Sequence, residues 1–201
     1  MTSPERTPAE AASDLDGPVG PQPGYDELPA CTAAGWASLA MGATALTVLT
    51  PLSEDPVGLY VASAMLAVGY AYLPTVVSWL AGGGVDGLTD APRVVGRAPD
   101  TRARAVLNGL IRAAFPAVLL LVALGALDWW RGSGSWAVLP GFLLGSAIAY
   151  RRAITGLRRR EQLTGCRIFR RADAPLIGWT HAQAMSQYLL LEPPPPEAGH
   201  S

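Results

Sequence analysis

The sequence contains no lysine and few charged side chains of any kind. Charged residues make up only 15% of the 201 residues, whereas roughly a quarter of an ordinary soluble domain is charged. The charges also avoid four long apolar stretches and gather in the segments that connect them. This segregation is typical of a membrane protein and disfavours a soluble globular domain.

Cysteine and histidine are scarce as well, which excludes several kinds of site. The two cysteines, Cys31 and Cys166, lie far apart in the chain and are predicted to be inert thiols rather than part of a disulfide framework or a zinc site. The two histidines, His181 and His200, form no cluster with other metal-binding residue types. We therefore expect no metal centre and no cofactor, and histidine-based metal catalysis is excluded.

The four apolar stretches have the length and composition of membrane-spanning helices. A bilayer core about 30 Å thick is crossed by roughly 20 apolar residues of helix. Short turns join the first stretch to the second and the third to the fourth, which predicts two helical hairpins. The predicted fold class is an all-α integral membrane protein, whose bundle at 32–154 contains four transmembrane helices at 33–52, 57–81, 106–127 and 136–154.

The remaining segments are predicted to lie outside the bilayer. Residues 1–31 are acidic, rich in proline and glycine and poor in large apolar side chains, which predicts a disordered N-terminal tail. Residues 155–192 form a basic juxtamembrane segment, and residues 193–201 begin with four prolines and form a flexible tail. The apolar part at 176–191 is interrupted by polar side chains, so we expect it on the membrane surface or against a partner.

The distribution of arginine predicts the orientation of the chain. Basic residues near the ends of spans are retained on the cytoplasmic side. The loop after the second span holds four arginines and the segment from Arg151 to Arg171 holds eight, whereas the other two turns hold only Arg131. Both termini of this multi-pass cell-membrane protein are therefore expected in the cytoplasm. Trp129 and Trp130 then fall at the outer interface, where amphipathic rings prefer to lie.

Small residues at a spacing of four mark candidate contact faces on each span. Helices in lipid gain little from hydrophobicity against one another, so close backbone approach carries much of their association. The sequence leaves open whether these faces meet inside one chain or between two copies. The favoured packing row is Gly141, Gly145 and Ala149 on the fourth span; the others are Ala34, Ser38 and Gly42 on the first, Ser63, Ala67 and Ala71 on the second, and Gly109, Ala113 and Ala117 on the third.

Arginines supply the candidate contacts to lipid phosphate. Arg112 is the only charged residue in the interior of a predicted span, since Arg151 and Arg152 lie at the end of the fourth; it either extends its side chain to water or contacts a lipid phosphate or a partner carboxylate. Arginines near a membrane surface are attracted to anionic head groups by about 1 kcal/mol each. Nucleic-acid binding is not expected, because no recognised fold or aromatic platform accompanies the charge. The candidate lipid contacts are Arg112, Arg151, Arg152, Arg158, Arg159 and Arg160.

Two sets of acidic residues are the candidates for catalysis. Asp86 and Asp90 lie in a glycine-rich cytoplasmic loop, and carboxylates of this kind hold magnesium and phosphate in some membrane enzymes. Glu54 and Asp128 lie near the outer tryptophans, where an acid beside aromatic rings is able to protonate an isoprenoid and stabilise a carbocation. A solvated loop and an ordinary aromatic belt explain the same residues without catalysis.

These observations favour a non-catalytic accessory or scaffolding role, in which the bundle anchors cytoplasmic segments to the membrane. The expected partners are membrane lipids with anionic head groups, a membrane or cytoplasmic protein, and a second copy of the chain. A membrane-embedded enzyme acting on a lipid or isoprenoid is one alternative. Another is a transporter or channel component that acts as an oligomer, with a polar path formed by Thr44, Thr47, Ser63, Ser78 and Asn108.

Overall fold

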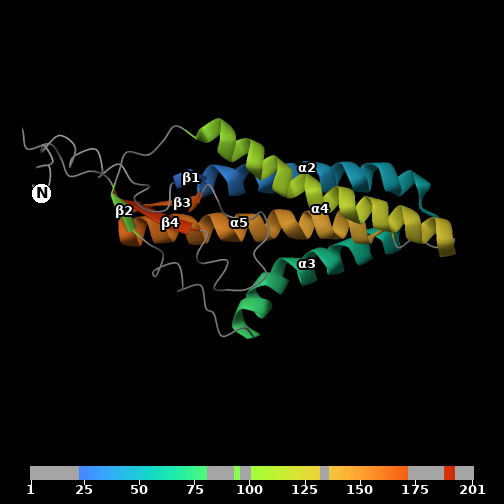
Figure 1. Ribbon diagram of the computed structural model, residues 1–201. Coiled ribbons are helices and arrows are strands. Elements are labelled where there is room, and N and C mark those ends of the chain that lie inside the picture. The colour runs from blue at the N-terminus through green and yellow to red at the C-terminus, as the bar shows by residue number, and fades with distance from the viewer. Residues whose placement is uncertain (1–22, 81–92, 96–100, 132–135, 172–187, 193–201) are drawn as a thin grey trace, which may run out of the picture.

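The computed structural model describes residues 23–80, 93–95, 101–131, 136–171 and 188–192, and helices account for 81% of them. Four long helices lie side by side, and a small sheet lies at one end of them (Figure 1). The helices are α2 (Glu27–Leu49), α3 (Pro56–Leu80), α4 (Arg102–Arg131) and α5 (Val138–Thr164), and the short 3-10 helix η2 (Thr50–Leu52) follows α2.

The central pair of the bundle is formed by α2 and α5. Helix α4 packs against α2, and α3 packs against α5. Helices α2 and α4 run away from the sheet, whereas α3 and α5 run back toward it, with α3 diverging from the others as it returns (Figure 1). The chain is thus arranged as two helical hairpins, α2 with α3 and α4 with α5.

The start of α2 differs from the predicted span. The helix begins at Glu27, ahead of the predicted start at residue 33, because the Asp26 carboxylate accepts a hydrogen bond from the N–H of Leu28 at 3.1 Å and caps the first turn. The last residues of the predicted tail at 1–31 therefore belong to a strand and to the first turns of α2, and residues 1–22 lie outside the described part of the chain.

The other helices also differ from the predicted spans at their ends. Helix α3 agrees within one residue at its start and begins at Pro56, where a proline suits the first turn. Helix α4 is longer than the predicted 106–127 at both ends, and α5 continues to Thr164 rather than stopping at 154. Arginine is a good helix former, so both helices continue through their basic residues once the apolar stretch has ended.

A four-stranded sheet corrects the expectation of an all-α fold. Its strand order is β1-β3-β4-β2, with β3 antiparallel to both β1 and β4, and with β2 parallel to β4. The strands come from three separate parts of the chain, one before α2, one between α3 and α4, and one after α5. They are β1 (Pro23–Asp26), β2 (Arg93–Val95), β3 (Arg167–Arg171) and β4 (Tyr188–Glu192).

The junction of α5 with the sheet is closely packed. Helix α5 ends at Gly165, whose φ of 67° is the left-handed conformation that glycine adopts at helix C-termini. The Glu161 carboxylate then accepts a hydrogen bond from the N–H of Ile168 at 3.2 Å, which holds the start of β3 against the end of α5. Ile168 and Leu190 pack in turn against Cys31 of α2 and are each no more than 2% exposed.

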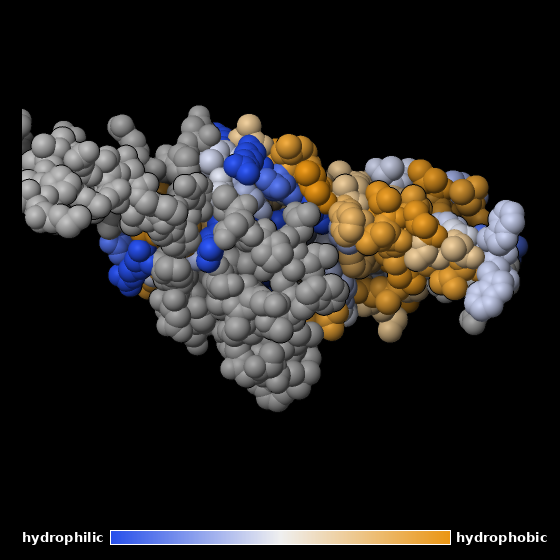
Figure 2. All heavy atoms as spheres, viewed as in Figure 1, coloured by the Kyte–Doolittle hydropathy of each residue, from blue (hydrophilic) through white to orange (hydrophobic). Residues whose placement is uncertain are grey.

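Of the helices that the structure describes, three are long and apolar enough to cross a membrane, namely Glu27–Leu52, Pro56–Leu73 and Arg102–Trp130. Hydrophobic residues cover the half of the bundle far from the sheet, and hydrophilic residues gather nearer the sheet (Figure 2). Helix α5 is not one of the three, because arginines follow its apolar part after Tyr150.

Candidate functional site: a buried arginine beside a cavity

The described residues contain one buried ion pair between two helices, formed by Arg112 of α4 and Glu27 of α2. Arg112 Nη1 donates to Glu27 Oε1 at 2.6 Å, and Nη2 donates to Glu27 Oε2 at 3.2 Å. The side chains are only 11% and 4% exposed, respectively. Such a two-point contact uses the planar geometry of the guanidinium fully and is among the strongest polar contacts in proteins.

Tyr25 of β1 completes the cluster and links it to the sheet. Arg112 Nη2 donates to the Tyr25 hydroxyl at 2.5 Å, and the guanidinium carbon lies 5.5 Å from the centre of the Tyr25 ring. The Cys31 thiol donates to Glu27 Oε1 at 3.5 Å from the next turn of α2. One arginine therefore joins α4 to α2 and β1. We call Tyr25, Glu27, Cys31 and Arg112 the arginine cluster.

Burial shapes the ionisation of the groups on the sheet side of this cluster. Removal from water raises the pKa of Tyr25, and the nearby positive charge of Arg112 only partly offsets this. Burial likewise raises the pKa of Tyr188 in β4, with the charge of Glu27 acting in the same direction. Both phenols therefore stay neutral at physiological pH and act as hydrogen-bonding groups rather than as bases.

The Glu27 carboxylate is poorly suited to general-base catalysis. It accepts hydrogen bonds from both Nη atoms of Arg112 and from the Cys31 thiol. Hydrogen bonds of this kind occupy the lone pairs that a base needs. The chemistry of the cluster is thus that of a clamp, which holds two helices and a strand together.

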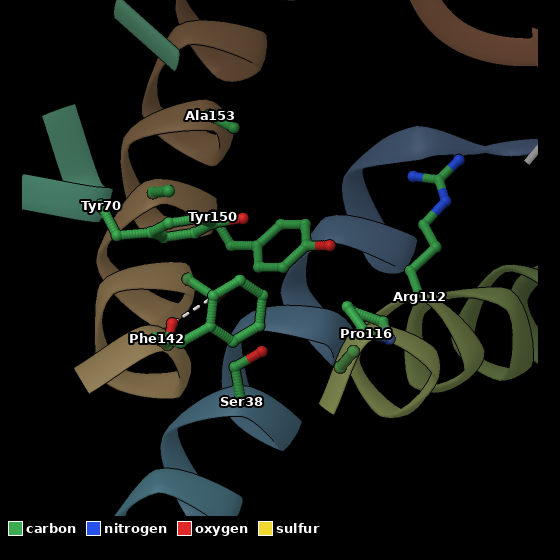
Figure 3. Close-up of a pocket in the computed structure, with 10 residues that line it drawn as sticks. Ser38, Tyr70, Arg112, Pro116, Phe142, Tyr150 and Ala153 are labelled. Atoms are coloured by element: carbon green, nitrogen blue, oxygen red, sulfur yellow. Dashed lines mark hydrogen bonds between the residues drawn. The ribbon is translucent and has the colours of Figure 1, made fainter. Parts of the chain in front are cut away.

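A cavity of about 270 Å³ lies next to the arginine cluster and is bordered by all four long helices. The side chains of Ser38 and Tyr150 point into this space, and Arg112 borders it from α4 (Figure 3). The ring centres of Tyr70 and Phe142 lie 4.5 Å apart on the α3 side. The full lining is Ser38, Tyr70, Arg112, Ala113, Pro116, Phe142, Ser146, Ala149, Tyr150 and Ala153.

One hydrogen-bond donor beside the cavity is not used. Among the described residues, Arg112 Nε is buried and has no hydrogen-bond partner, although both Nη atoms of the same side chain are bonded. A buried donor without an acceptor costs about 1–3 kcal/mol. Within the described residues, the arginine cluster therefore holds one buried N–H group whose hydrogen-bonding capacity is not used.

The glycine row of α5 faces α3 within the same chain. A Cβ atom on Gly145 would lie 2.7 Å from the Ala67 carbonyl oxygen, and one on Gly141 would lie 2.9 Å from the Ser63 carbonyl oxygen. Ala149, the third member of the row, lines the cavity instead. The rows predicted on the other spans are confirmed as buried at Ala34, Ser38 and Gly42, at Ser63, Ala67 and Ala71, and at Gly109, Ala113 and Ala117.

The structure describes only two of the four candidate catalytic acids, Glu54 and Asp128. Asp86 and Asp90 lie outside the described residues. Glu54 is exposed in the turn before α3, and Asp128 lies near the end of α4. The neighbouring Asp55 has a structural role, because its carboxylate caps α3 by accepting a hydrogen bond from the Gly58 N–H at 2.9 Å.

Three of the residues proposed for a polar path bond to backbone carbonyl oxygens. The Thr47 and Asn108 side chains donate to carbonyl oxygens one turn earlier in their own helices, and the Ser63 hydroxyl donates to the Ala137 carbonyl oxygen. The side chain of Ser78 lies outside the described part of the structure. The cavity is instead lined by hydroxyl groups that the sequence did not single out, those of Tyr70 and Tyr150.

The arginines predicted to contact lipid phosphate lie in two environments. Arg112 is paired with Glu27 of the same chain, a contact that the sequence did not predict. Arg152 donates to the Ala71 carbonyl oxygen at 3.5 Å and lies 4.6 Å from the centre of the Tyr72 ring. Lipid contacts stay a prediction for Arg112 and Arg152, as for the exposed Arg151, Arg158 and Arg159 and the half-buried Arg160.

Comparisons of the chain with protein-family models, with curated proteins and with solved structures found no match. The function has to be inferred from the geometry of the chain itself.

Sequence reasoning missed the partner of Arg112. Glu27 was assigned to the tail, and 85 positions separate it from Arg112. The signal was present in Asp26, because an aspartate directly before Glu27 and an apolar stretch is typical of a helix N-cap. A first span that starts at residue 27 includes the Glu27 carboxylate in its first turn, at the end of the helix nearest the sheet.

Proposed function

We propose that this chain is a multi-pass membrane protein with a non-catalytic accessory or scaffolding role. Four helices cross the membrane, both termini lie in the cytoplasm, and the bundle holds a small cytoplasmic sheet at the membrane surface. The observation that carries this proposal is the sheet itself, whose strands come from three separate parts of the chain and meet at one end of the bundle.

The topology of the sheet supports four crossings. Strand β1 precedes α2, β2 lies between α3 and α4, and β3 follows α5. If these three segments are on one side of a membrane, each hairpin has to cross it an even number of times. Helix α5 is then the fourth span, despite its short apolar part, because Arg151 and Arg152 are long enough to extend to the interface.

The position of the arginines supports a cytoplasmic sheet. Arg151, Arg152, Arg158 and Arg159 are exposed on the half of α5 nearest the sheet. Basic residues are retained on the cytoplasmic side, and at a membrane surface they attract anionic head groups. We infer that this half of α5 contacts both the lipid surface and a protein partner.

The arrangement of the acids supports a role without catalysis. Glu27 is held by three donors, and Asp55 caps a helix. Within the part of the chain that the structure describes, no group of three or more histidine, cysteine or acidic residues is placed to hold a metal ion. Polar contacts of the described residues join elements of the fold, as at Arg112, or stabilise single helices, as at Asp55.

Purification of the full chain in mild detergent, after cross-linking in cells, tests the scaffolding role. We expect a protein partner in fixed stoichiometry, which is lost in the double variant Arg158→Glu/Arg159→Glu. The matched control Trp129→Ala, at the far end of the bundle, should retain the partner, because Trp129 is 93% exposed and distant from the sheet. A large homo-oligomer without other proteins would favour the transporter alternative, and equal partner recovery from both variants would contradict the proposal.

A further inference from the structure

The cavity between the four long helices is large enough for a ring compound. Its volume is about 270 Å³, whereas a cavity of about 150 Å³ with apolar walls is able to bind benzene. The cavity is only partly enclosed. Helix α3 packs on α5 and α4 packs on α2, and both border the cavity, which therefore lies between these two outer helices.

Aromatic rings form a large part of the cavity wall. The ring centres of Tyr70 and Phe142 lie 4.5 Å apart and the two rings are tilted by 57°. The Tyr150 ring extends across the cavity from α5 (Figure 3). Aromatic rings pack favourably against the face or the edge of another ring. The wall therefore suits a flat ring better than a flexible hydrocarbon chain.

Two hydroxyl groups of the wall are available to a ligand. The Ser38 and Tyr150 side chains point into the cavity (Figure 3), and Ser38 is only 1% exposed. Within the part of the chain that the structure describes, neither hydroxyl has a hydrogen-bond partner. The Ser146 hydroxyl differs, because it donates to the Phe142 carbonyl oxygen at 2.8 Å. Buried hydroxyl groups are normally bonded, so an oxygen atom of a ligand would supply the missing acceptor.

The charges around the cavity favour an uncharged ligand. Among the lining residues, only Arg112 is charged, and its Nη atoms donate to Glu27 and Tyr25. Its guanidinium is directed away from the side chains that meet in the cavity (Figure 3). A carboxylate or phosphate in this space would be removed from water without a counter-charge, which is unfavourable.

We propose that this cavity binds an uncharged, flat ring compound with a carbonyl oxygen, the chemistry of a quinone. The carbonyl oxygen accepts hydrogen bonds from the Ser38 and Tyr150 hydroxyls, and the ring packs against Phe142 and Tyr70. The inference rests on the proposed function, because helices in a membrane allow a lipid-soluble ligand to enter from the bilayer. An acyl chain would occupy the cavity without using either hydroxyl group.

Three ring compounds of similar size test the chemistry of the ligand. Thermal unfolding of the full chain in mild detergent, followed by light scattering, reports binding as a rise in the unfolding temperature. We expect a saturable rise with duroquinone, whose methyl groups block addition to thiols. Durene, which has the same ring and methyl groups but no oxygen, should bind about tenfold more weakly. Mesitoate, a methylated benzoate with a charged carboxylate, should not bind. No rise with duroquinone, or an equal rise with all three compounds, would overturn the proposal.

Three variants test whether the two hydroxyl groups hold the ligand. Ser38→Ala and Tyr150→Phe each remove only a hydroxyl group, so both are expected to fold and to bind duroquinone about two- to tenfold more weakly. The matched control is Ser63→Ala. Ser63 is also 1% exposed, but its hydroxyl donates to the Ala137 carbonyl oxygen and it does not line the cavity. This control should bind as the wild type does.

Weaker binding in at least one cavity variant, with unchanged binding in Ser63→Ala, supports the site. Unchanged binding in both cavity variants, or the same loss in the control, would contradict it. If neither cavity variant folds, the comparison of duroquinone with durene and mesitoate on the wild type still decides the question.

The same preparations separate this inference from the proposed function. If the chain keeps its cross-linked partner but duroquinone does not stabilise it, the ligand site is wrong and the scaffolding role stands. If the chain binds duroquinone but no partner is recovered, the scaffolding role is wrong and the site stands. If the chain is recovered without detergent from the soluble fraction, both are wrong.

Discussion

The two ends of the helix bundle are held together by different interactions. At the sheet end, buried charged and polar groups connect helices to strands, as in the contact of Arg112 with Glu27 and Tyr25. In the far half, small and aliphatic residues fill the interfaces, as at Gly145 against α3 and in the cluster of Ala117, Leu124, Leu139 and Leu143.

This difference agrees with the two environments that we propose for the chain, lipid around the far half and water around the sheet end. The far half exposes large side chains such as Leu52 and Met65, at 74% and 71%, which is unfavourable in water and favourable in lipid. The sheet end buries apolar residues such as Ile168 and Leu189 and exposes arginine, as a domain in water does. In the proposed membrane, polar contacts therefore stabilise the ends of α2 and α4 at the bilayer surface. Close approach of helix backbones stabilises the half of the bundle inside the bilayer.

The largest effect is expected when the buried ion pair is broken. Glu27→Gln leaves the Arg112 charge buried without its anion and should lower the free energy of unfolding by about 3–5 kcal/mol. Glu192→Gln is the matched control, because the Arg93–Glu192 pair, at 3.2 Å, also joins distant parts of the chain but has side chains that are 61% and 34% exposed. Its loss should cost no more than about 1 kcal/mol. Unfolding by sodium dodecyl sulfate in mixed micelles measures both; equal effects would show that burial does not make the Arg112–Glu27 contact the stronger one.

A smaller effect is expected where helices meet in the far half. Gly145→Ala places a methyl group against the Ala67 carbonyl oxygen and Tyr70 and should cost about 1–3 kcal/mol by forcing α3 and α5 apart. Gly125→Ala has no atom within 4 Å of the new methyl group and should be neutral or stabilising by up to about 1 kcal/mol. The same unfolding assay compares them. A neutral Gly145→Ala would mean that close approach does not hold this interface.

The smallest effect is expected at alkaline pH, where the ionisation of Tyr188 at the sheet end should lower the stability of the folded chain. Burial raises the pKa of Tyr188 above the ordinary value of 10.0, so the folded chain opposes loss of this proton. The corresponding stability is complete below about pH 10 and falls as the pH rises toward the folded pKa, by at most about 1.4 kcal/mol per pH unit. Tyr188→Phe should make the decline between about pH 9.5 and 11 shallower. A decline of the same slope in the variant would show that Tyr188 is not responsible.

Much of the helical architecture was predictable, because each helix is encoded locally. The long apolar stretches and Pro56 determine where four helices lie, and the spacing of Ala34, Ser38 and Gly42 identifies a face that is buried. The helix ends were less predictable, because α5 continues through Arg151 and Arg152, where the apolar pattern stops.

The sheet and the arginine cluster were not predictable in the same way, because both depend on contacts between distant segments. Strands of three to five residues, such as β2 and β4, carry too few residues to show an alternating pattern. Their pairing joins Arg93 to Leu190 and Pro23 to Arg171, so only the folded chain brings them together. Arg112 was identified as the one ionisable residue of its span, but its partner Glu27 depends on the same tertiary arrangement.

Cysteine accessibility in intact cells tests the central claim most directly, namely that the sheet end lies in the cytoplasm and the far end outside. The native cysteines are both buried, so the background carries Cys31→Ala and Cys166→Ala. Glu54→Cys, in the exposed turn before α3, should react with a membrane-impermeant maleimide in intact cells. Leu163→Cys, 77% exposed near the end of α5, should react only after the membrane is permeabilised. Labelling of Leu163→Cys in intact cells, or labelling of both sites only after permeabilisation, would contradict the account.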